Sequence, residues 1–212
     1  MLYNKPPLPI ANIEINVSEF FKYLYLPIKL GDSAVISIEP RLDPICPIIG
    51  RACSDFVGKN GLDEFVQSYI YVTAKNEYQQ KGQSFNRPGW HSDGFGTNDI
   101  SYIWSNKQPT IFNGSNFDLC DDDTASMAQM EEQADERFNF TLPNNSLIRM
   151  DQFTIHRVGE PEEGVRCFVK IVFSRDQYKL IGNSVNYNLP YKWEYSPRRP
   201  ERNIPQGKLN VR

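Results

Sequence analysis

The residues in this chain that could do chemistry include its only two histidines. His91 lies two residues before Asp93 in the segment WHSDGFG, residues 90–96. In a strand, residues i and i+2 point to the same side, so this pair can offer an imidazole nitrogen and a carboxylate oxygen to one ion. The second histidine, His156, lies far along the chain in MDQFTIHRVGE. If the two segments meet in space, the three side chains could hold one metal ion.

Such a set has a specific chemistry. Two histidines and one carboxylate form the facial triad of non-haem iron(II) oxygenases, which leaves positions on the metal open for a co-substrate and dioxygen. Two other interpretations stay open. In the first, the histidines are structural, because a lone H-x-D tripeptide arises by chance and a lone strand histidine is usually structural. In the second, the chain is a cupin-like metal-binding barrel, although cupins usually use more histidines in a tighter first motif.

The elements that must position these residues are mostly short strands. Strands are predicted at 89–96, 100–106, 109–114, 146–150, 154–158 and 165–174, separated by Gly, Pro, Asn and Asp. Residues 61–80 predict a short helix followed by a strand, and the acidic segment near 118–138 predicts a helical insertion. Near the N-terminus, 17–26 predicts a helix capped by Ser18, and 33–40 predicts a strand.

The last predicted strand, VRCFVKIVFS, has two different faces. One face collects Val165, Cys167, Val169, Ile171 and Phe173, and is purely apolar. The other face carries Arg166 and Lys170 among Phe168 and Val172. A solvent-facing side would explain two cations, but the interior of a barrel that holds a ligand explains them better.

Length and composition fit one globular domain of 212 residues. We expect residues 1–68 to pack on the barrel, 69–181 to form the core, and 182–212 to form an extended basic tail. No apolar run reaches the roughly 20 residues of a membrane helix, so we expect a cytoplasmic protein without a membrane partner. The net charge of −3 does not indicate a nucleic-acid binder.

The order of these motifs resembles the iron(II)- and 2-oxoglutarate-dependent oxygenase superfamily. The resemblance covers about residues 69–174 and comprises H-x-D, a later strand histidine, and then Arg166 on a β-rich segment. It implies a mainly β fold with flanking helices, a double-stranded β-helix or jelly-roll barrel. It also implies Fe(II) held by His91, Asp93 and His156, with 2-oxoglutarate as co-substrate.

The same resemblance suggests residues for the co-substrate. Arg166 is the expected partner of the distal carboxylate of 2-oxoglutarate, since a guanidinium matches a carboxylate with two parallel hydrogen bonds. Lys170 is the reserve candidate. Asn76 and Tyr78 resemble the N-x-Y of AlkB-type nucleic-acid demethylases, whose amide and phenol contact the co-substrate. The chain departs from the arginine-x-serine pattern of many members, because Phe168 replaces the serine.

The expected activity is hydroxylation of a small molecule, such as an amino acid or its conjugate. Nucleic acid or a protein side chain is the alternative substrate, and a non-catalytic metal-binding β-helix is the alternative class. Trp90, Phe95, Arg87 and Arg157 are candidate substrate contacts. For Tyr102 and Trp104, core packing is the preferred interpretation.

Overall fold

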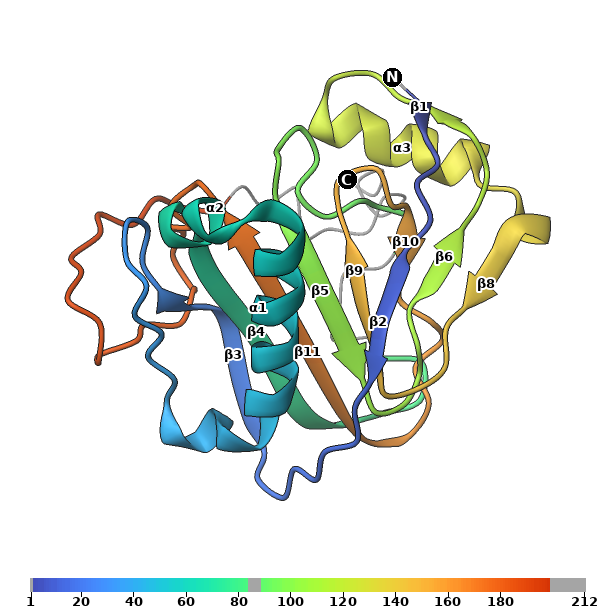
Figure 1. The fold of residues 1–212 in the computed structure, drawn as a ribbon. Helices are drawn as coiled ribbons and strands as arrows, with labels where there is room; N and C mark the ends of the chain where they lie inside the picture. The colour runs from blue at the N-terminus through green and yellow to red at the C-terminus, as the bar shows by residue number, and fades with distance from the viewer. Residues whose placement is uncertain (1, 84–88, 199–212) are drawn as a thin grey trace.

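The computed structural model describes residues 2–83 and 89–198, and these form a mainly β structure with few helices (Figure 1). The largest sheet has six antiparallel strands in the order β2-β9-β5-β11-β4-β3. Its strands are β2 (Leu8–Asn12), β9 (Ser146–Met150), β5 (Ile100–Ser105), β11 (Gly164–Ser174), β4 (Tyr69–Gln79) and β3 (Phe21–Lys29). The β-rich expectation is therefore confirmed. None of the described sheets closes on itself, so the jelly-roll barrel remains a proposal.

Two smaller sheets complete the β structure. The three-stranded sheet has the order β10-β6-β8, with β10 (His156–Arg157), β6 (Ile111–Asn113) and β8 (Asn139–Thr141). The other sheet pairs β1 (Leu2–Tyr3) with β7 (Phe117–Asp118). The three-stranded sheet carries His156, so its position relative to the larger sheet determines the geometry of the candidate site.

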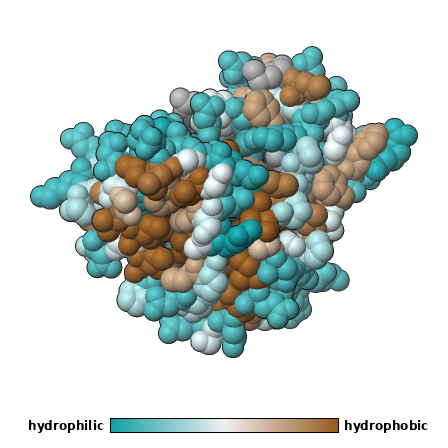
Figure 2. Space-filling view, in the orientation of Figure 1, coloured by the Kyte–Doolittle hydropathy of each residue, from teal (hydrophilic) through white to brown (hydrophobic). Residues whose placement is uncertain are grey.

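The central strand β11 separates two environments. Cys167, Val169, Ile171 and Phe173 belong to the main hydrophobic core, and Phe173 stacks on Phe56 of α1 (Cys46–Asn60) with ring centroids 4.0 Å apart. Figure 2 shows hydrophobic residues on either side of α1 on this face of the molecule. The alternate residues of β11 therefore point to the other side of the sheet, toward the three-stranded sheet.

The helix predicted at 17–26 and the strand predicted at 33–40 were both wrong. Residues 17–26 do not form a helix, because β3 begins at Phe21 and pairs with β4. Alternating aromatic residues suit a strand, and Pro27 within β3 is tolerated because β3 is an edge strand. Residues 33–39 form neither a strand nor a helix. Instead the N-terminal segment supplies β2 and β3 to the six-stranded sheet.

Helices α1 and α2 (Leu62–Gln67) cover the apolar side of the six-stranded sheet, and α3 (Asp123–Gln133) packs beside the two-stranded sheet. After η1 (Pro40–Ile45), α1 places Ile48, Ile49, Ala52 and Phe56 on one buried face, at helical spacing. The next helix is α2, as predicted. The predicted insertion is also helical: α3 is capped by Asp122, whose carboxylate accepts from two backbone N–H groups, and η2 (Glu136–Phe138) follows.

The C-terminal segment from Arg175 to Arg198 packs on β3 and β4. Asn186 is buried, and its amide donates to the carbonyls of Pro27 and Ser37. The basic residues of the predicted tail beyond Arg198 lie outside the described part of the chain. In residues 2–83 and 89–198, no helix has both the length and the apolar character that crossing a membrane requires.

Candidate metal centre

Backbone pairing brings the two histidine segments together. His91 and His156 form an antiparallel bridge, with each backbone N–H donating to the other's carbonyl at 3.0 and 2.9 Å. His156 also pairs with Phe112 of β6, which ties the bridge to the three-stranded sheet. The segment 89–96, predicted as a strand, contributes only this single bridge and is otherwise turns and bends. This single bridge is formed by His91, so it places the first predicted ligand directly beside His156.

The three predicted ligands lie close enough to share one ion. One ligand atom from each of His91, Asp93 and His156 lies within 4.8 Å of the other two. His156 Nε2 is 3.5 Å from Asp93 Oδ2, and the two imidazole centroids are 4.5 Å apart. The side chains of His156 and Asp93 are 7 % and 18 % exposed, so the cluster is recessed but reachable.

The imidazole rings are oriented by backbone carbonyls. His91 Nδ1 lies 2.9 Å from the carbonyl of Gly89, and His156 Nδ1 lies 3.1 Å from that of Thr154. A protonated Nδ1 that donates to a carbonyl leaves Nε2 as the basic nitrogen, which is the tautomer that a metal requires. Both rings therefore have the outer support typical of metal-bound histidines.

Lys170 is the charged neighbour of the cluster. Its Nζ lies 2.6 Å from Asp93 Oδ1, and its side chain is 10 % exposed. Burial alone would raise the pKa of Asp93, but the Lys170 ammonium and the two imidazoles outweigh it and hold that pKa well below its usual range. Burial would lower the pKa of Lys170, and chiefly the Asp93 carboxylate raises it instead. Asp93 is therefore a carboxylate and Lys170 an ammonium.

Arg166 lies on the same face of β11 but contacts different groups. Its Nε and Nη2 donate to the backbone carbonyls of Lys107 and Gln108, each at 3.1 Å, and its guanidinium lies over the Phe168 ring. Burial lowers its pKa to about 10. Four residues of strand, roughly 13 Å, separate it from Lys170. Its predicted role with the co-substrate therefore has less geometric support than that of Lys170.

Asn76 and Tyr78 do not lie near the cluster, which corrects the expectation from the N-x-Y pattern. In the β4–β11 register, Lys170 is opposite Thr73, whereas Asn76 is opposite Cys167. Because strand residues alternate, Asn76 and Tyr78 point to the other side of the sheet. The Asn76 amide donates to Glu19 and Val17 carbonyls, and the Tyr78 hydroxyl donates to Glu163.

The predicted substrate residues are largely engaged in packing. Trp90 is 4 % exposed within a second core cluster, and Arg157 lies over its ring at 4.6 Å. Phe95 is partly buried and stacks on Tyr3 with centroids 5.5 Å apart. Arg87 lies outside the described residues. A substrate role for these residues stays a prediction.

The two aromatics assigned to the core do lie there. Tyr102 and Trp104 are buried in the main hydrophobic core, as predicted. Each also makes one hydrogen bond there: the Tyr102 hydroxyl to Asp55 and the Trp104 indole N–H to the Ile13 carbonyl.

Three residues near Lys170 were not predicted from the sequence. The Tyr178 hydroxyl donates to the buried carboxylate of Asp99, and the Tyr25 ring lies 5.7 Å from Lys170 Nζ. Tyr25 fell in the segment wrongly predicted as a helix, and Tyr178 lies beyond the last strand. No local pattern in the sequence marks either one.

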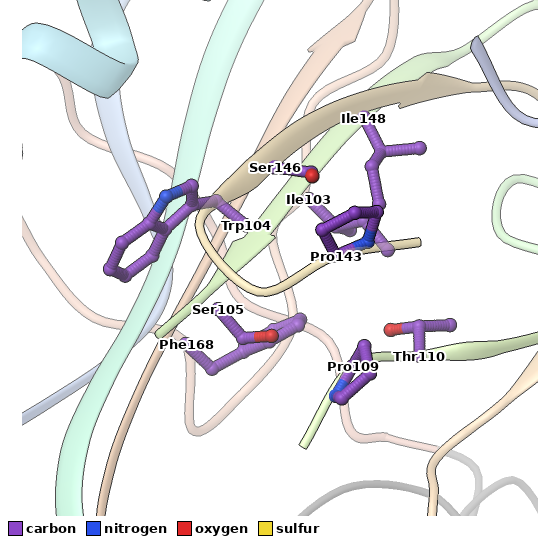
Figure 3. Close-up of a pocket in the computed structure, with 9 residues that line it drawn as sticks. All are labelled: Ile103, Trp104, Ser105, Pro109, Thr110, Pro143, Ser146, Ile148 and Phe168. Atoms are coloured by element: carbon purple, nitrogen blue, oxygen red, sulfur yellow. The ribbon is translucent and has the colours of Figure 1, made fainter. Parts of the chain in front are cut away.

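A pocket of about 220 Å³, including open solvent, is lined by residues of β5 and β9 and by Phe168 of β11 (Figure 3). In the sheet, Phe168 is opposite Ser105 and Lys170 is opposite Ile103, and the pocket is lined by Phe168, Ser105 and Ile103 but not by Lys170. None of its lining residues is charged: Ile103, Trp104, Ser105, Pro109, Thr110, Pro143, Ser146, Ile148 and Phe168. It offers no cation to a dicarboxylate.

Comparisons with known proteins do not assign the chain to a family. No protein-family model matches the sequence, and no curated protein matches it. The functional conclusion therefore depends on the site itself.

Proposed function

We propose that this protein is an iron(II)- and 2-oxoglutarate-dependent dioxygenase that hydroxylates a small molecule on a jelly-roll β scaffold. One observation carries the proposal. His91, Asp93 and His156, which are the residues that the motif order singles out, have ligand atoms within 4.8 Å of one another. Two imidazoles and one carboxylate leave half of an octahedral metal open, as this chemistry requires.

The donor set fits iron(II). Both Nδ1 atoms face backbone carbonyls, so both Nε2 atoms suit a metal, and the carboxylate of Asp93 supplies the anionic ligand. With 2-oxoglutarate bound, the metal would supply oxidative decarboxylation and hydroxylation of a substrate C–H bond. The protein would contribute the position of the ligands and a recessed, mostly buried site.

For the distal carboxylate of 2-oxoglutarate we propose Lys170 in place of Arg166. The Lys170 ammonium lies beside the cluster, and its long stem lets it turn toward a second carboxylate. Arg166 would first have to give up its two hydrogen bonds to the backbone carbonyls of Lys107 and Gln108. Breaking such bonds costs free energy that co-substrate binding would have to offset.

A small-molecule substrate suits the limited access. The ligand side chains are at most partly exposed, and α3 lies near the site because Glu131 accepts from the backbone N–H of Trp90. The insertion therefore narrows the approach beside His91. A folded nucleic acid or protein would have to present a single protruding group to reach the cluster.

The competing interpretation is a buried structural network without catalysis. It is favoured by the Lys170–Asp93 contact, because an ammonium at 2.6 Å neutralises the carboxylate without any metal. In that case metal ions would bind weakly or not at all. A metal-binding module that does not bind 2-oxoglutarate is the third outcome.

The test is metal binding followed by co-substrate turnover. Fe(II) or Mn(II) titrated into the purified protein under anaerobic conditions should bind one per chain, and His91→Ala, Asp93→Ala and His156→Ala should each abolish binding. With Fe(II), the wild type should then release succinate and carbon dioxide from 2-oxoglutarate in air, slowly without substrate. Full turnover by a folded His156→Ala variant would refute the triad.

A further inference from the structure

Tyr25 has an unusual backbone conformation for its type. It has φ of 46°, whereas the other described non-glycine residues with positive φ are Asp32, Gln108 and Asn145. A bulky aromatic in the left-handed region is strained, and such strain persists only where the surrounding structure enforces it. The register of β3 against β4 is irregular at this point, between Tyr23 and Leu26.

The C-terminal segment enforces this conformation. Ser184 and Leu24 exchange two hydrogen bonds, from the Leu24 N–H to Ser184 Oγ at 2.9 Å and from the Ser184 N–H to the Leu24 carbonyl at 2.8 Å. The Tyr25 N–H donates to Thr73 Oγ1 at 3.0 Å. Thr73 is opposite Lys170 in the sheet, so the strained residue is fixed directly beside the candidate site.

Two cations lie within 6 Å of the centroid of the Tyr25 ring. Lys170 Nζ is 5.7 Å and the Arg198 guanidinium 5.8 Å from the ring centroid. Tyr178 packs edge-on against the ring at 5.3 Å while its hydroxyl binds Asp99. The negative face of an aromatic ring attracts a cation within about 6 Å, more strongly when the pair is desolvated.

We propose that Tyr25 is a positioning residue for the Lys170 ammonium, and that the C-terminal segment from Arg175 to Arg198 is therefore part of the site. A lysine side chain has four rotatable carbons and loses rotamer freedom when fixed. The ring holds the ammonium beside Asp93, where it can meet the co-substrate carboxylate. This inference rests on the proposed function for its effect on 2-oxoglutarate, but the contact itself can be tested separately.

The first experiment measures 2-oxoglutarate affinity in the Fe(II)-loaded, anaerobic protein. Tyr25→Leu should raise the Kd for 2-oxoglutarate about tenfold and leave the Kd for Fe(II) within about threefold, because a desolvated cation–ring contact is lost. Tyr25→Phe keeps the ring and should restore the affinity to within about threefold. Tyr23→Leu, two residues away and packed against the main core, is the matched control and should bind like the wild type.

The second experiment needs no co-substrate. In a double-mutant cycle of Tyr25→Leu and Lys170→Met, the unfolding equilibrium constant should change about fivefold less than the product of the single effects. The inference would be overturned if the effects of the two single substitutions on the unfolding equilibrium constant were additive. It would also be overturned if Tyr25→Leu and Tyr25→Phe raised the Kd for 2-oxoglutarate equally. Coupling in a protein that binds no 2-oxoglutarate would refute the proposed function and keep the positioning contact.

Discussion

Arg166 and Lys170 are two cations on one face of one strand, and their surroundings differ. Arg166 is bound to two backbone carbonyls of the loop before β6, whereas Lys170 lies 2.6 Å from a carboxylate in the candidate metal cluster. Both are at least nine-tenths buried. Burial of a cation therefore does not by itself identify a ligand site, because carbonyls can satisfy a guanidinium as part of the scaffold.

The opposite, apolar face of β11 is a useful comparison for both Arg166 and Lys170. There Phe173 packs against Phe56 of α1 and Phe65 of α2, within the main hydrophobic core. Changes on that face should alter stability alone. Changes around Lys170 should alter ligand binding, and changes around Arg166 should resemble those on the apolar face.

The largest expected effect is on the apolar face. Phe173→Ala should lower the free energy of unfolding by about 4 kcal/mol, since it removes a buried ring stacked on Phe56. In whatever fraction remains folded, the Kd for Fe(II) should stay unchanged. Urea unfolding monitored by circular dichroism and an anaerobic metal titration would check the two parts, and weaker metal binding would show that the faces are coupled.

Lys170→Met should raise the Kd for 2-oxoglutarate about 100-fold at saturating Fe(II). A charge-assisted hydrogen bond to a carboxylate contributes roughly 2–3 kcal/mol, and methionine has a similar length without the charge. Equilibrium binding under anaerobic conditions would measure this. An unchanged Kd would exclude Lys170 and restore Arg166 as the candidate.

Arg166→Met should show the reverse pattern. The free energy of unfolding should fall by about 2 kcal/mol, because the carbonyls of Lys107 and Gln108 lose their donors. The Kd for 2-oxoglutarate should stay within about threefold of the wild type. If the Kd rises far more than the stability falls, the original assignment of Arg166 to the distal carboxylate is correct.

The smallest effect concerns Lys75, which is opposite Phe168 and on the same face as both cations. Burial lowers its pKa to about 8 from 10.5, so the folded chain binds this proton more weakly than the unfolded chain. The wild type should therefore gain stability as pH rises from 8 to 10.5. Lys75→Met should stabilise the protein by roughly 1–2 kcal/mol at pH 7 and not at all above pH 10.5.

The measurement for Lys75 is denaturant unfolding of both proteins across this pH range. A constant difference between the wild type and Lys75→Met at every pH would contradict the assignment of a depressed pKa.

Much of the central sheet could be predicted because its signals are local. Alternation in residues 165–174 indicated an apolar face and a face with cations, and the structure has both. The spacing of His91 and Asp93 predicted a shared side, although the segment is a turn with one bridge and not a full strand. The helical insertion was predicted from an aspartate before good helix formers, and Asp122 does cap α3.

The failures concern tertiary contacts that no local pattern contains. The apolar and aromatic side chains of residues 17–26 fit both the helical period and the strand period. The segment forms a strand from Phe21 because it pairs with β4. The sequence ranked Arg166 before Lys170, because no local pattern shows that the backbone carbonyls of Lys107 and Gln108 approach the Arg166 guanidinium. The N-x-Y pattern failed because Asn76 and Tyr78 share the sheet face opposite to Lys170.

The most direct test of the central claim is an anaerobic titration of the Fe(II)-loaded protein with 2-oxoglutarate, monitored by visible absorption. A charge-transfer band should develop and saturate with 2-oxoglutarate in the wild type and in Arg166→Met. The band should be absent in Asp93→Ala. A folded, metal-loaded wild type that develops no band at any 2-oxoglutarate concentration would contradict the proposed function.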